Sequence, residues 1–143
     1  MNKNETVLFG MKNAEKIAEK VSKLINVPLS KINRTVYADG EVMLVSEPTV
    51  RDRDVFIIAN TSKPVNDNIM ELLLFIDSLK RASARTINVC LTYYGYARQD
   101  RKASGRQPIG AKLVADLLQT KVLQKLLVLT YIIHLFKVFL IYL

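Results

Sequence analysis

The segment of residues 93–102, which reads YYGYARQDRK, carries the side chains best suited to binding a phosphorylated ligand. Arg98 and Arg101 offer guanidinium groups that bind phosphate oxygens through paired hydrogen bonds, and Lys102 adds a mobile positive charge. The segment follows an apolar run at residues 87–91, of the kind that forms a buried parallel strand. Because ligands of parallel sheets gather at the carboxyl ends of the strands, these residues indicate a polyphosphate site. A solvated basic turn is the alternative, but such a turn does not need three tyrosines and a glycine in the same ten residues.

This segment resembles the signature of the ribose-phosphate pyrophosphokinase family. Three further segments resemble motifs of the same family, in its order and at its spacing: YADGE at 37–41, NDNIME at 66–71 and SGRQPIGAK at 104–112. The resemblance covers residues 5–120. It implies the N-terminal half of a two-domain protein in which each half has the phosphoribosyltransferase-type α/β fold.

The resemblance also implies a reaction. The family transfers the β,γ-diphosphoryl group of ATP to the anomeric hydroxyl of ribose 5-phosphate, giving PRPP and AMP for nucleotide biosynthesis, and it requires Mg²⁺. Catalysis of this kind rests on positioning and on neutralising the charge of the phosphoryl transition state. By resemblance, Arg98 and Gln99 hold ATP, with Asp100 and Arg101 beside them in the same wall.

A second part of the implied ATP site lies at residues 37–41. Tyr37 matches a family position at which an aromatic ring stacks on adenine, and a tyrosine keeps the flat apolar face that stacking needs. Asp39 and Glu41 would accept hydrogen bonds from the adenine amino group or the ribose hydroxyls. In the family the two parts of the site come from neighbouring subunits, so the resemblance implies a homo-oligomer.

Most of these residues also have an ordinary structural explanation. Asp39 and Gly40 between two strand-like runs are typical of a hairpin turn. Asn66 or Asp67 is more simply explained as the cap of a following helix than as a ligand. Glu71 is similarly explained as a first-turn partner of the helix dipole.

The hydrophobic pattern alternates between strands and helices, which predicts an α/β fold with a mostly parallel sheet and three layers. Continuous apolar runs at 54–58 and 86–91 are separated by an amphipathic helix at 66–81. We therefore expect Ile57 and Val89 on adjacent central strands. The remaining expected strands lie at 6–9 and 42–45, and the remaining expected helices at 14–25 and 111–119.

Composition sets the class of protein. The chain has 143 residues, of which 50% are hydrophobic, enough for one domain with a buried core. One cysteine, Cys90, lies in a strand-like run, and no apolar signal segment opens the sequence, so we expect a cytoplasmic protein. The net charge of +8 is spread along the chain, with a local concentration at 98–106. A nucleotide or sugar phosphate explains that cluster as well as a nucleic acid does, and the resemblance favours the former; we expect no nucleic-acid partner.

Residues 121–143 form a strongly hydrophobic tail, KVLQKLLVLTYIIHLFKVFLIYL. A membrane span needs about 20 apolar residues, and the tail is long enough. Lys125 and Lys137 argue against a span, because each costs about 2.5–3.5 kcal/mol near a bilayer centre. We therefore expect no membrane association.

The genetic code offers a better explanation of the tail. Back-translation with AT-rich codons, with one A restored in the lysine codon after Thr120, gives a frame that reads TKGVTKVISFDIHYS and then QGFFDIP. This resembles the family's continuation, a buried strand that ends in D-x-H and is followed by QGFFDIP. We therefore expect a ribose-phosphate pyrophosphokinase N-terminal domain at 1–120 and an out-of-frame tail at 121–143, which would leave the sheet with an unpaired edge.

Three functional hypotheses follow. The first is an enzyme by family, a ribose-phosphate diphosphokinase, that is inactive as this chain alone. In the family, the metal-linked histidine, the catalytic lysine and arginine segment and the ribose-phosphate loop all follow the position of Thr120. We therefore assign no catalytic residue and no metal ligand to this chain. The second is a non-catalytic, PRPP-synthetase-associated regulatory subunit that joins oligomers. The intact residues 98–101 favour the first. The third, a membrane-anchored or nucleic-acid-binding module, rests only on the tail and the net charge.

Overall fold

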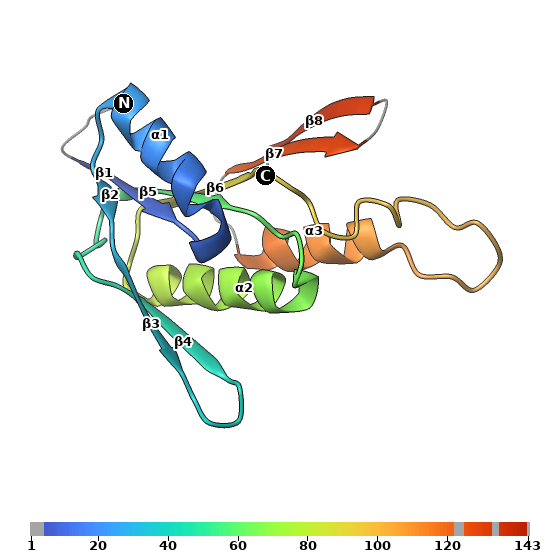
Figure 1. Ribbon diagram of the computed structural model, residues 1–143, viewed down its shortest axis with the longest axis horizontal. Coiled ribbons are helices and arrows are strands. Elements are labelled where there is room, and N and C mark those ends of the chain that lie inside the picture. The colour runs from blue at the N-terminus through green and yellow to red at the C-terminus, as the bar shows by residue number, and fades with distance from the viewer. Residues whose placement is uncertain (1–4, 122–124, 133–134, 143) are drawn as a thin grey trace.

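A six-stranded sheet forms the centre of the computed structural model, which describes residues 5–121, 125–132 and 135–142 (Figure 1). The strands lie in the order β2-β1-β5-β6-β7-β8. The sheet strands are β1 (Thr6–Gly10), β2 (Leu29–Ser30), β5 (Asp54–Ala59), β6 (Thr86–Leu91), β7 (Lys125–Ile132) and β8 (Leu135–Tyr142). The other elements are the hairpin strands β3 (Ile32–Val36) and β4 (Val42–Ser46), the short 3-10 helix η2 (Lys12–Ala14), and the helices α1 (Glu15–Ile25), α2 (Val65–Arg81) and α3 (Gly110–Lys121).

The sheet is parallel from β2 through β7, and β8 pairs antiparallel with β7. The two strands with continuous apolar sequences, β5 and β6, are neighbours, and Ile57 is the register partner of Val89. Parallel strands that are covered on both faces read as continuous apolar runs, which is why these two could be recognised. The prediction of a mostly parallel α/β sheet with these residues on adjacent strands is confirmed.

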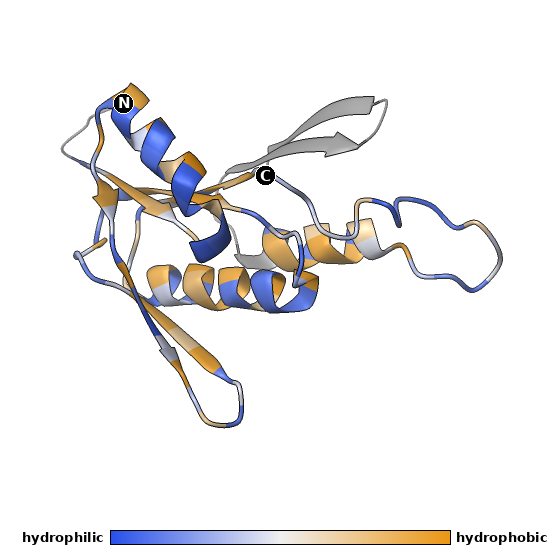
Figure 2. Cartoon of the chain, in the orientation of Figure 1, coloured by the Kyte–Doolittle hydropathy of each residue, from blue (hydrophilic) through white to orange (hydrophobic). Residues whose placement is uncertain are grey.

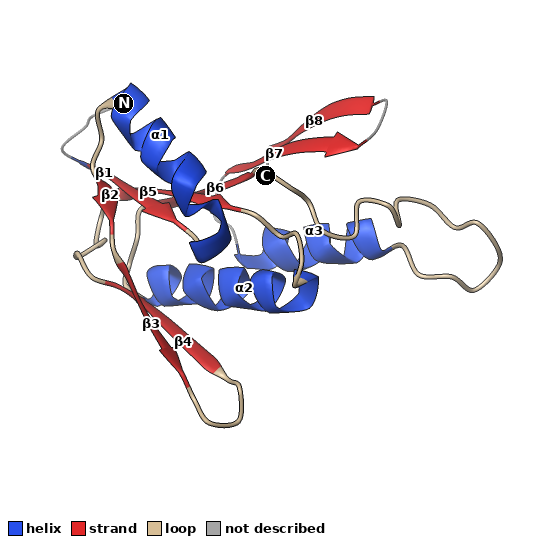
Figure 3. Ribbon diagram, viewed as in Figure 1, coloured by secondary structure: helices blue, strands red, loops and turns tan. Residues whose placement is uncertain are grey.

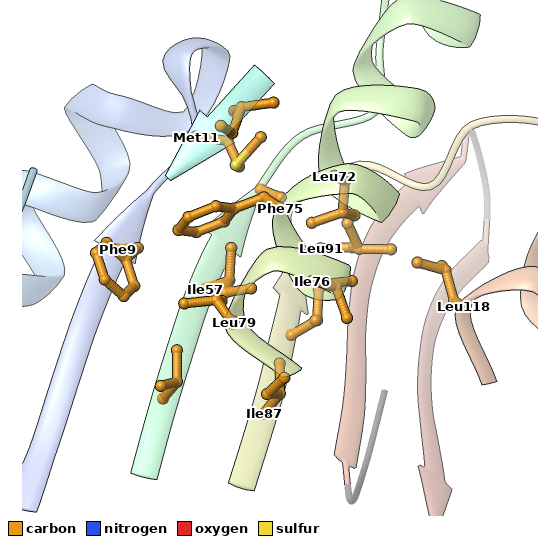
Figure 4. Close-up of a cluster of buried hydrophobic side chains, with 14 of the residues drawn as sticks. Phe9, Met11, Ile57, Leu72, Phe75, Ile76, Leu79, Ile87, Leu91 and Leu118 are labelled. Atoms are coloured by element: carbon orange, nitrogen blue, oxygen red, sulfur yellow. The ribbon is translucent and has the colours of Figure 1, made fainter. Parts of the chain in front are cut away.

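Helices cover both faces of the sheet, α1 on one side and α2 with α3 on the other (Figure 3). Each face has its own cluster of buried side chains. The smaller cluster joins Ala14 and Ala18 to Leu8 and Ile58. The larger cluster lies under α2, where the rings of Phe9 and Phe75 meet edge to face with centroids 5.1 Å apart (Figure 4). The three-layer arrangement expected from the sequence is therefore confirmed.

Helix α2 buries the stripe that its sequence predicts, but its start differs from the expectation. Ile69, Leu72, Ile76 and Leu79 are buried against the sheet. Pro64 occupies the N-cap position, without a side-chain capping bond, and its carbonyl accepts a hydrogen bond from the Asn68 N–H at 3.1 Å. The expectation that a side chain at 66 or 67 caps this helix is therefore wrong.

The hairpin β3–β4 leaves the sheet and extends away from it (Figure 1). Leu44 at its base is buried in the larger cluster. Arg34 binds Glu71 of α2 through two hydrogen bonds, Nη2 to Oε1 at 2.6 Å and Nε to Oε2 at 3.1 Å. Glu71 lies beyond the first turn of α2 and pairs with the hairpin, so its expected role as a first-turn dipole partner is wrong.

The tail continues the sheet. Residues 125–128 of β7 pair in parallel with residues 88–91 of β6, and β8 folds back on β7. The expected unpaired edge at β6 is therefore wrong, because an apolar, strand-forming segment satisfies the exposed backbone groups of that edge whatever its origin. Within the described ranges, the helices are all too short or too polar to cross a membrane.

Candidate functional site

The chain after β6 is held by the chain after β5, so that two loops at the carboxyl edge of the sheet act as one unit. The Thr61 hydroxyl donates to the Tyr93 carbonyl at 2.8 Å and accepts from the Gly95 N–H at 2.7 Å. Thr61 itself is only 1% exposed. A Cβ on Gly95 would lie 2.8 Å from both the Thr61 carbonyl oxygen and Val65 Cγ1, so the close approach requires glycine here.

Tyr96 shapes the turn that follows. Its φ of 64° lies in the left-handed region, which is uncommon for an aromatic residue and costs about 1–3 kcal/mol. The Tyr96 hydroxyl donates to Asn66 Oδ1 at 2.5 Å, which ties the turn to the first turn of α2. The Gln99 N–H donates to the Tyr96 carbonyl at 2.8 Å, and the Ala111 N–H donates to the Gln99 carbonyl at 3.1 Å. The backbone of residues 96–99 is therefore fixed from both sides.

Arg98 and Gln99 line a cavity of about 470 Å³ at this edge of the sheet. Its other walls come from the loop after β5 and the start of α2, and from the two tyrosines of the turn. The full lining is Ser62, Lys63, Val65, Asn66, Tyr93, Tyr96, Ala97, Arg98 and Gln99. A guanidinium and an amide that face a cavity beside polar side chains are groups that bind the oxygens of a phosphorylated ligand.

Asp100 and Arg101 lie in the middle of the long loop between β6 and α3, part of which is drawn in blue in Figure 2. Both side chains are exposed. Further along this loop, Gln107 Oε1 accepts hydrogen bonds from the backbone N–H groups of Ala103 and Ser104, at 2.9 and 3.2 Å. The structure thus separates the four adjacent residues expected at the site into a pair on the cavity and a pair on the outer loop.

Tyr94 ties the loop after β6 to helix α3. Its hydroxyl donates to the Ala111 carbonyl at 2.7 Å, which joins the end of β6 to the start of α3. Burial raises the pKa of Tyr94 to about 12, and the negative charge of Asp116 adds to the shift. Tyr94 is therefore a neutral structural residue at physiological pH.

Tyr37, Asp39 and Glu41 lie at the tip of the β3–β4 hairpin. The turn predicted for Asp39 and Gly40 is present: Gly40 has a φ of 92°, and the Glu41 N–H donates to the Asp39 carboxylate at 3.1 Å. Tyr37 is 47% exposed, and its hydroxyl lies 3.6 Å from the sulfur of Met43. Figure 1 shows this tip at one extremity of the molecule, apart from the segment after β6, so the two groups of expected site residues are not brought together within one chain.

Three residues of the cavity region escaped the sequence reasoning: Thr61, Lys63 and the bonded role of Asn66. Thr61 and Lys63 lie in the loop after β5 and Asn66 in the first turn of α2, and the carboxyl end of β5 is at the same edge as that of β6. The rule that located Arg98, a polar residue after a buried parallel strand, applies equally to the loop after β5 and would have indicated them. Among the residues that the structure describes, no group of three or more His, Cys, Asp and Glu side chains is placed to hold a metal ion.

Comparisons with known proteins agree with this geometry. Residues 6–121 match the model of the N-terminal domain of ribose phosphate pyrophosphokinase. The ribose-phosphate pyrophosphokinase of Mycoplasmopsis pulmonis is 58% identical over 128 residues, which are 90% of this chain and 40% of that protein. The corresponding protein of Fusobacterium nucleatum is 51% identical over 120 residues, 84% of this chain and 38% of its own length.

A solved structure gives the same result in three dimensions. The crystal structure of phosphoribosylpyrophosphate synthetase from Mycobacterium smegmatis superposes with a TM-score of 0.82 at 37% identity, over 87% of this chain and 42% of that one. The chain therefore spans about 40% of the length of the relatives it matches. From the family match and these similarities together, the chain belongs to the ribose-phosphate pyrophosphokinase family, of which it carries the N-terminal domain.

Proposed function

We propose that residues 6–121 form the ATP-binding half of a ribose-phosphate diphosphokinase, which transfers diphosphate from ATP to ribose 5-phosphate and gives PRPP and AMP. The observation that carries the proposal is the cavity at the carboxyl edge of β5 and β6, which Arg98 and Gln99 line and where backbone hydrogen bonds hold Gln99 on both sides. A phosphoryl transfer depends on holding the phosphates in place and neutralising their charge, and a guanidinium on such a cavity serves both purposes.

The outer loop provides the second element of this proposal. Asp100 and Arg101 lie in the middle of this loop, next to the cavity residues in sequence and exposed to solvent. A hydrophilic loop that begins at a ligand cavity is suited to closing over the bound phosphates and excluding water from them. In this role Arg101 would add positive charge to the occupied site, and Asp100 would orient it through a hydrogen bond.

The hairpin tip supplies the adenine end of the site in our proposal, from a second copy of the chain. Tyr37 presents an exposed ring for stacking, and Asp39 and Glu41 present exposed carboxylates for the adenine amino group or the ribose hydroxyls. The separation of this tip from the cavity within one chain supports a homo-oligomer in which the tip of one subunit completes the cavity of the next. We further propose a cytoplasmic location, as for an enzyme whose substrates are soluble nucleotides and sugar phosphates.

Mg²⁺ enters this proposal with ATP. The described residues do not provide a cluster of three His, Cys, Asp or Glu side chains that could hold a metal ion, so we assign no metal site to them. The ion would neutralise part of the charge on the β- and γ-phosphates, while Arg98 and Gln99 hold the same phosphates from the protein side. The 143-residue chain by itself is expected to form no PRPP, because the resemblance places the ribose-phosphate loop after the N-terminal domain.

A chimaera tests the proposal. Residues 6–121 of this chain replace the matching segment of the Mycoplasmopsis pulmonis relative, to which the chain is 58% identical over 128 residues. We expect Mg-dependent PRPP formation from ATP and ribose 5-phosphate, reduced at least about a hundredfold by Arg98→Ala and little changed by Arg81→Ala, a substitution at the far end of α2. A folded, oligomeric chimaera that neither binds ATP nor forms PRPP would contradict the assignment.

A non-catalytic regulatory subunit is the second candidate function. It is favoured by the exposed hairpin with its apolar residues Val36, Met43 and Val45, which suits a subunit that acts through assembly. The chimaera distinguishes the two functions, because a regulatory domain would assemble and stay inactive whether or not Arg98 is present.

A further inference from the structure

The cavity that holds Arg98 has a second positive charge from another loop. Lys63 lies in the chain between β5 and α2 and lines the same cavity of about 470 Å³. The charged side chains in the described lining are Lys63 and Arg98, and no carboxylate is among them. Two cations from separate loops that line one cavity, with no carboxylate in its described lining, favour an anionic occupant with several oxygens.

The loop that precedes Lys63 is held by hydrogen bonds of its own residues. The Asn60 side-chain amide donates to the Thr92 hydroxyl at 3.1 Å, and the Thr92 N–H donates to the Ala59 carbonyl at 2.9 Å. The Asn68 amide of α2 donates to the carbonyl of Ser62, the residue before Lys63, at 2.6 Å. The loop that carries Lys63 is therefore fixed against the loop that carries Arg98, and the spacing of their backbones is set by the fold.

A neighbouring cavity of about 360 Å³ also includes Lys63 in its wall, but its lining carries charges of both signs. Lys63 and Lys12 share that lining with Asp67, and Arg34 and Glu71 neutralise each other in an ion pair. Lys63 thus lines both cavities, the one of about 360 Å³ with charges of both signs and the one of about 470 Å³ whose charged lining residues are both cations. A phosphate chain bound by Arg98 would be stabilised further by the Lys63 ammonium group, because the flexible lysine side chain can extend into either cavity.

We propose that Lys63 is a further phosphate-binding residue, which contacts the phosphate chain of the nucleoside triphosphate from the side opposite Arg98. The inference rests on the proposed function, because it concerns the same cavity. It assigns a role to a residue outside the signature segment, and it makes the loop after β5 the second wall of the phosphate site.

Calorimetric titration of the 143-residue chain, at low ionic strength, tests this assignment with three probes: ATP, AMP and inorganic tripolyphosphate. We expect Lys63→Ala to weaken ATP and tripolyphosphate binding by about three- to tenfold, with a smaller effect on AMP, which has one phosphate. Lys63→Arg should retain most of the affinity. Lys80→Ala, near the C-terminal end of α2, should leave binding unchanged, and added salt should reduce the difference between Lys63→Ala and the wild type.

The outcomes separate the two proposals. If Lys63→Ala binds ATP and tripolyphosphate like the wild type while Arg98→Ala weakens both, the role of Lys63 is wrong and the cavity remains a nucleotide site. If the wild-type chain binds neither ATP nor tripolyphosphate, the proposed function of this cavity fails and the role of Lys63 fails with it. A thermal unfolding curve for each variant guards against misfolding, and a Lys63→Arg protein that folds yet binds as weakly as Lys63→Ala would also overturn the assignment.

Discussion

Ile57 and Val89 face each other across adjacent parallel strands at the centre of the sheet, and both are essentially inaccessible to solvent. This register sets how β5 and β6 are aligned along their length. Two carboxyl ends then lie at one edge, and the loops that follow them share the cavity of Arg98 and Lys63. The position of the candidate site is thus a direct consequence of how two apolar runs pair.

Ile57→Ala should destabilise the chain strongly. Ile57 is 0% exposed, and deleting its buried methyl and methylene groups leaves a cavity, so we expect a loss of about 2–5 kcal/mol in the free energy of unfolding. Leu24 is 84% exposed, and Leu24→Ala should change stability by less than about 0.5 kcal/mol. Urea unfolding of the two variants provides the comparison, and equal losses would contradict the packing described here.

The Arg34–Glu71 pair should be coupled energetically. Its two hydrogen bonds and the low exposure of the Glu71 side chain, 13%, make it stronger than an open surface pair. A double-mutant cycle with Arg34→Gln and Glu71→Gln should give a coupling of about 1–2 kcal/mol.

The same hairpin provides a matched control for that cycle. Lys31 and Glu47 are 3.7 Å apart with both side chains more than half exposed, and their coupling should be below about 0.5 kcal/mol. Equal coupling in both cycles would show that the Arg34–Glu71 pair does not hold the hairpin to α2.

Gly95→Ala should disturb the cavity. The added methyl would lie 2.8 Å from the Thr61 carbonyl oxygen and from Val65 Cγ1, so the loops after β5 and β6 must move apart, at a cost of about 1–3 kcal/mol. ATP affinity should fall with it. At Gly105 an added Cβ meets no atom within 4 Å, so Gly105→Ala should be nearly neutral in both thermal unfolding and ATP titration. A Gly95→Ala protein with wild-type affinity would show that the close approach of the loops is not needed for binding.

Alkaline pH should weaken the fold through Tyr94. The pKa of this tyrosine is about 12 in the folded chain, against about 10 for an unfolded tyrosine. Because the folded pKa is the higher one, the stabilisation is complete below about pH 10 and is lost as the pH rises towards 12. Ultraviolet titration of phenolate formation should show a late-titrating group that is absent from Tyr94→Phe. If the two titration curves coincide, Tyr94 is not buried as described.

The origin of the tail can be tested at the level of DNA. We propose that residues 121–143 are read out of frame and that a frame one base away continues the family's sequence after Thr120. Resequencing the coding DNA beyond that codon decides the question, and unrelated sequence in every frame would refute the proposal. Restoring the frame should replace the present β7 by a strand that was selected for the same edge of β6.

The sequence by itself determined the central strands, the main helix and the Arg98 segment. Strands β5 and β6 are predominantly apolar, and α2 carries an apolar stripe at helical spacing, so local composition was sufficient for each. The strand β3 was missed because its residues are mostly polar and exposed, and it is a strand through its pairing with β4. Such a strand gives no alternating signal in the sequence, because it buries little of either face.

Only the tertiary structure decided which distant residues meet. The sequence around Glu71 predicts a helix-dipole partner, whereas the fold pairs Glu71 with Arg34 of the hairpin. The sequence predicts no role for Lys63, which lines the cavity with Arg98 because β5 and β6 end at the same edge of the sheet. The tail was expected to leave β6 as an unpaired edge, yet its residues 125–128 pair with β6. An open sheet edge can pair with any strand that satisfies its hydrogen-bonding groups. Local pattern reports what each segment forms, whereas contacts between segments depend on register and packing, which no single segment contains.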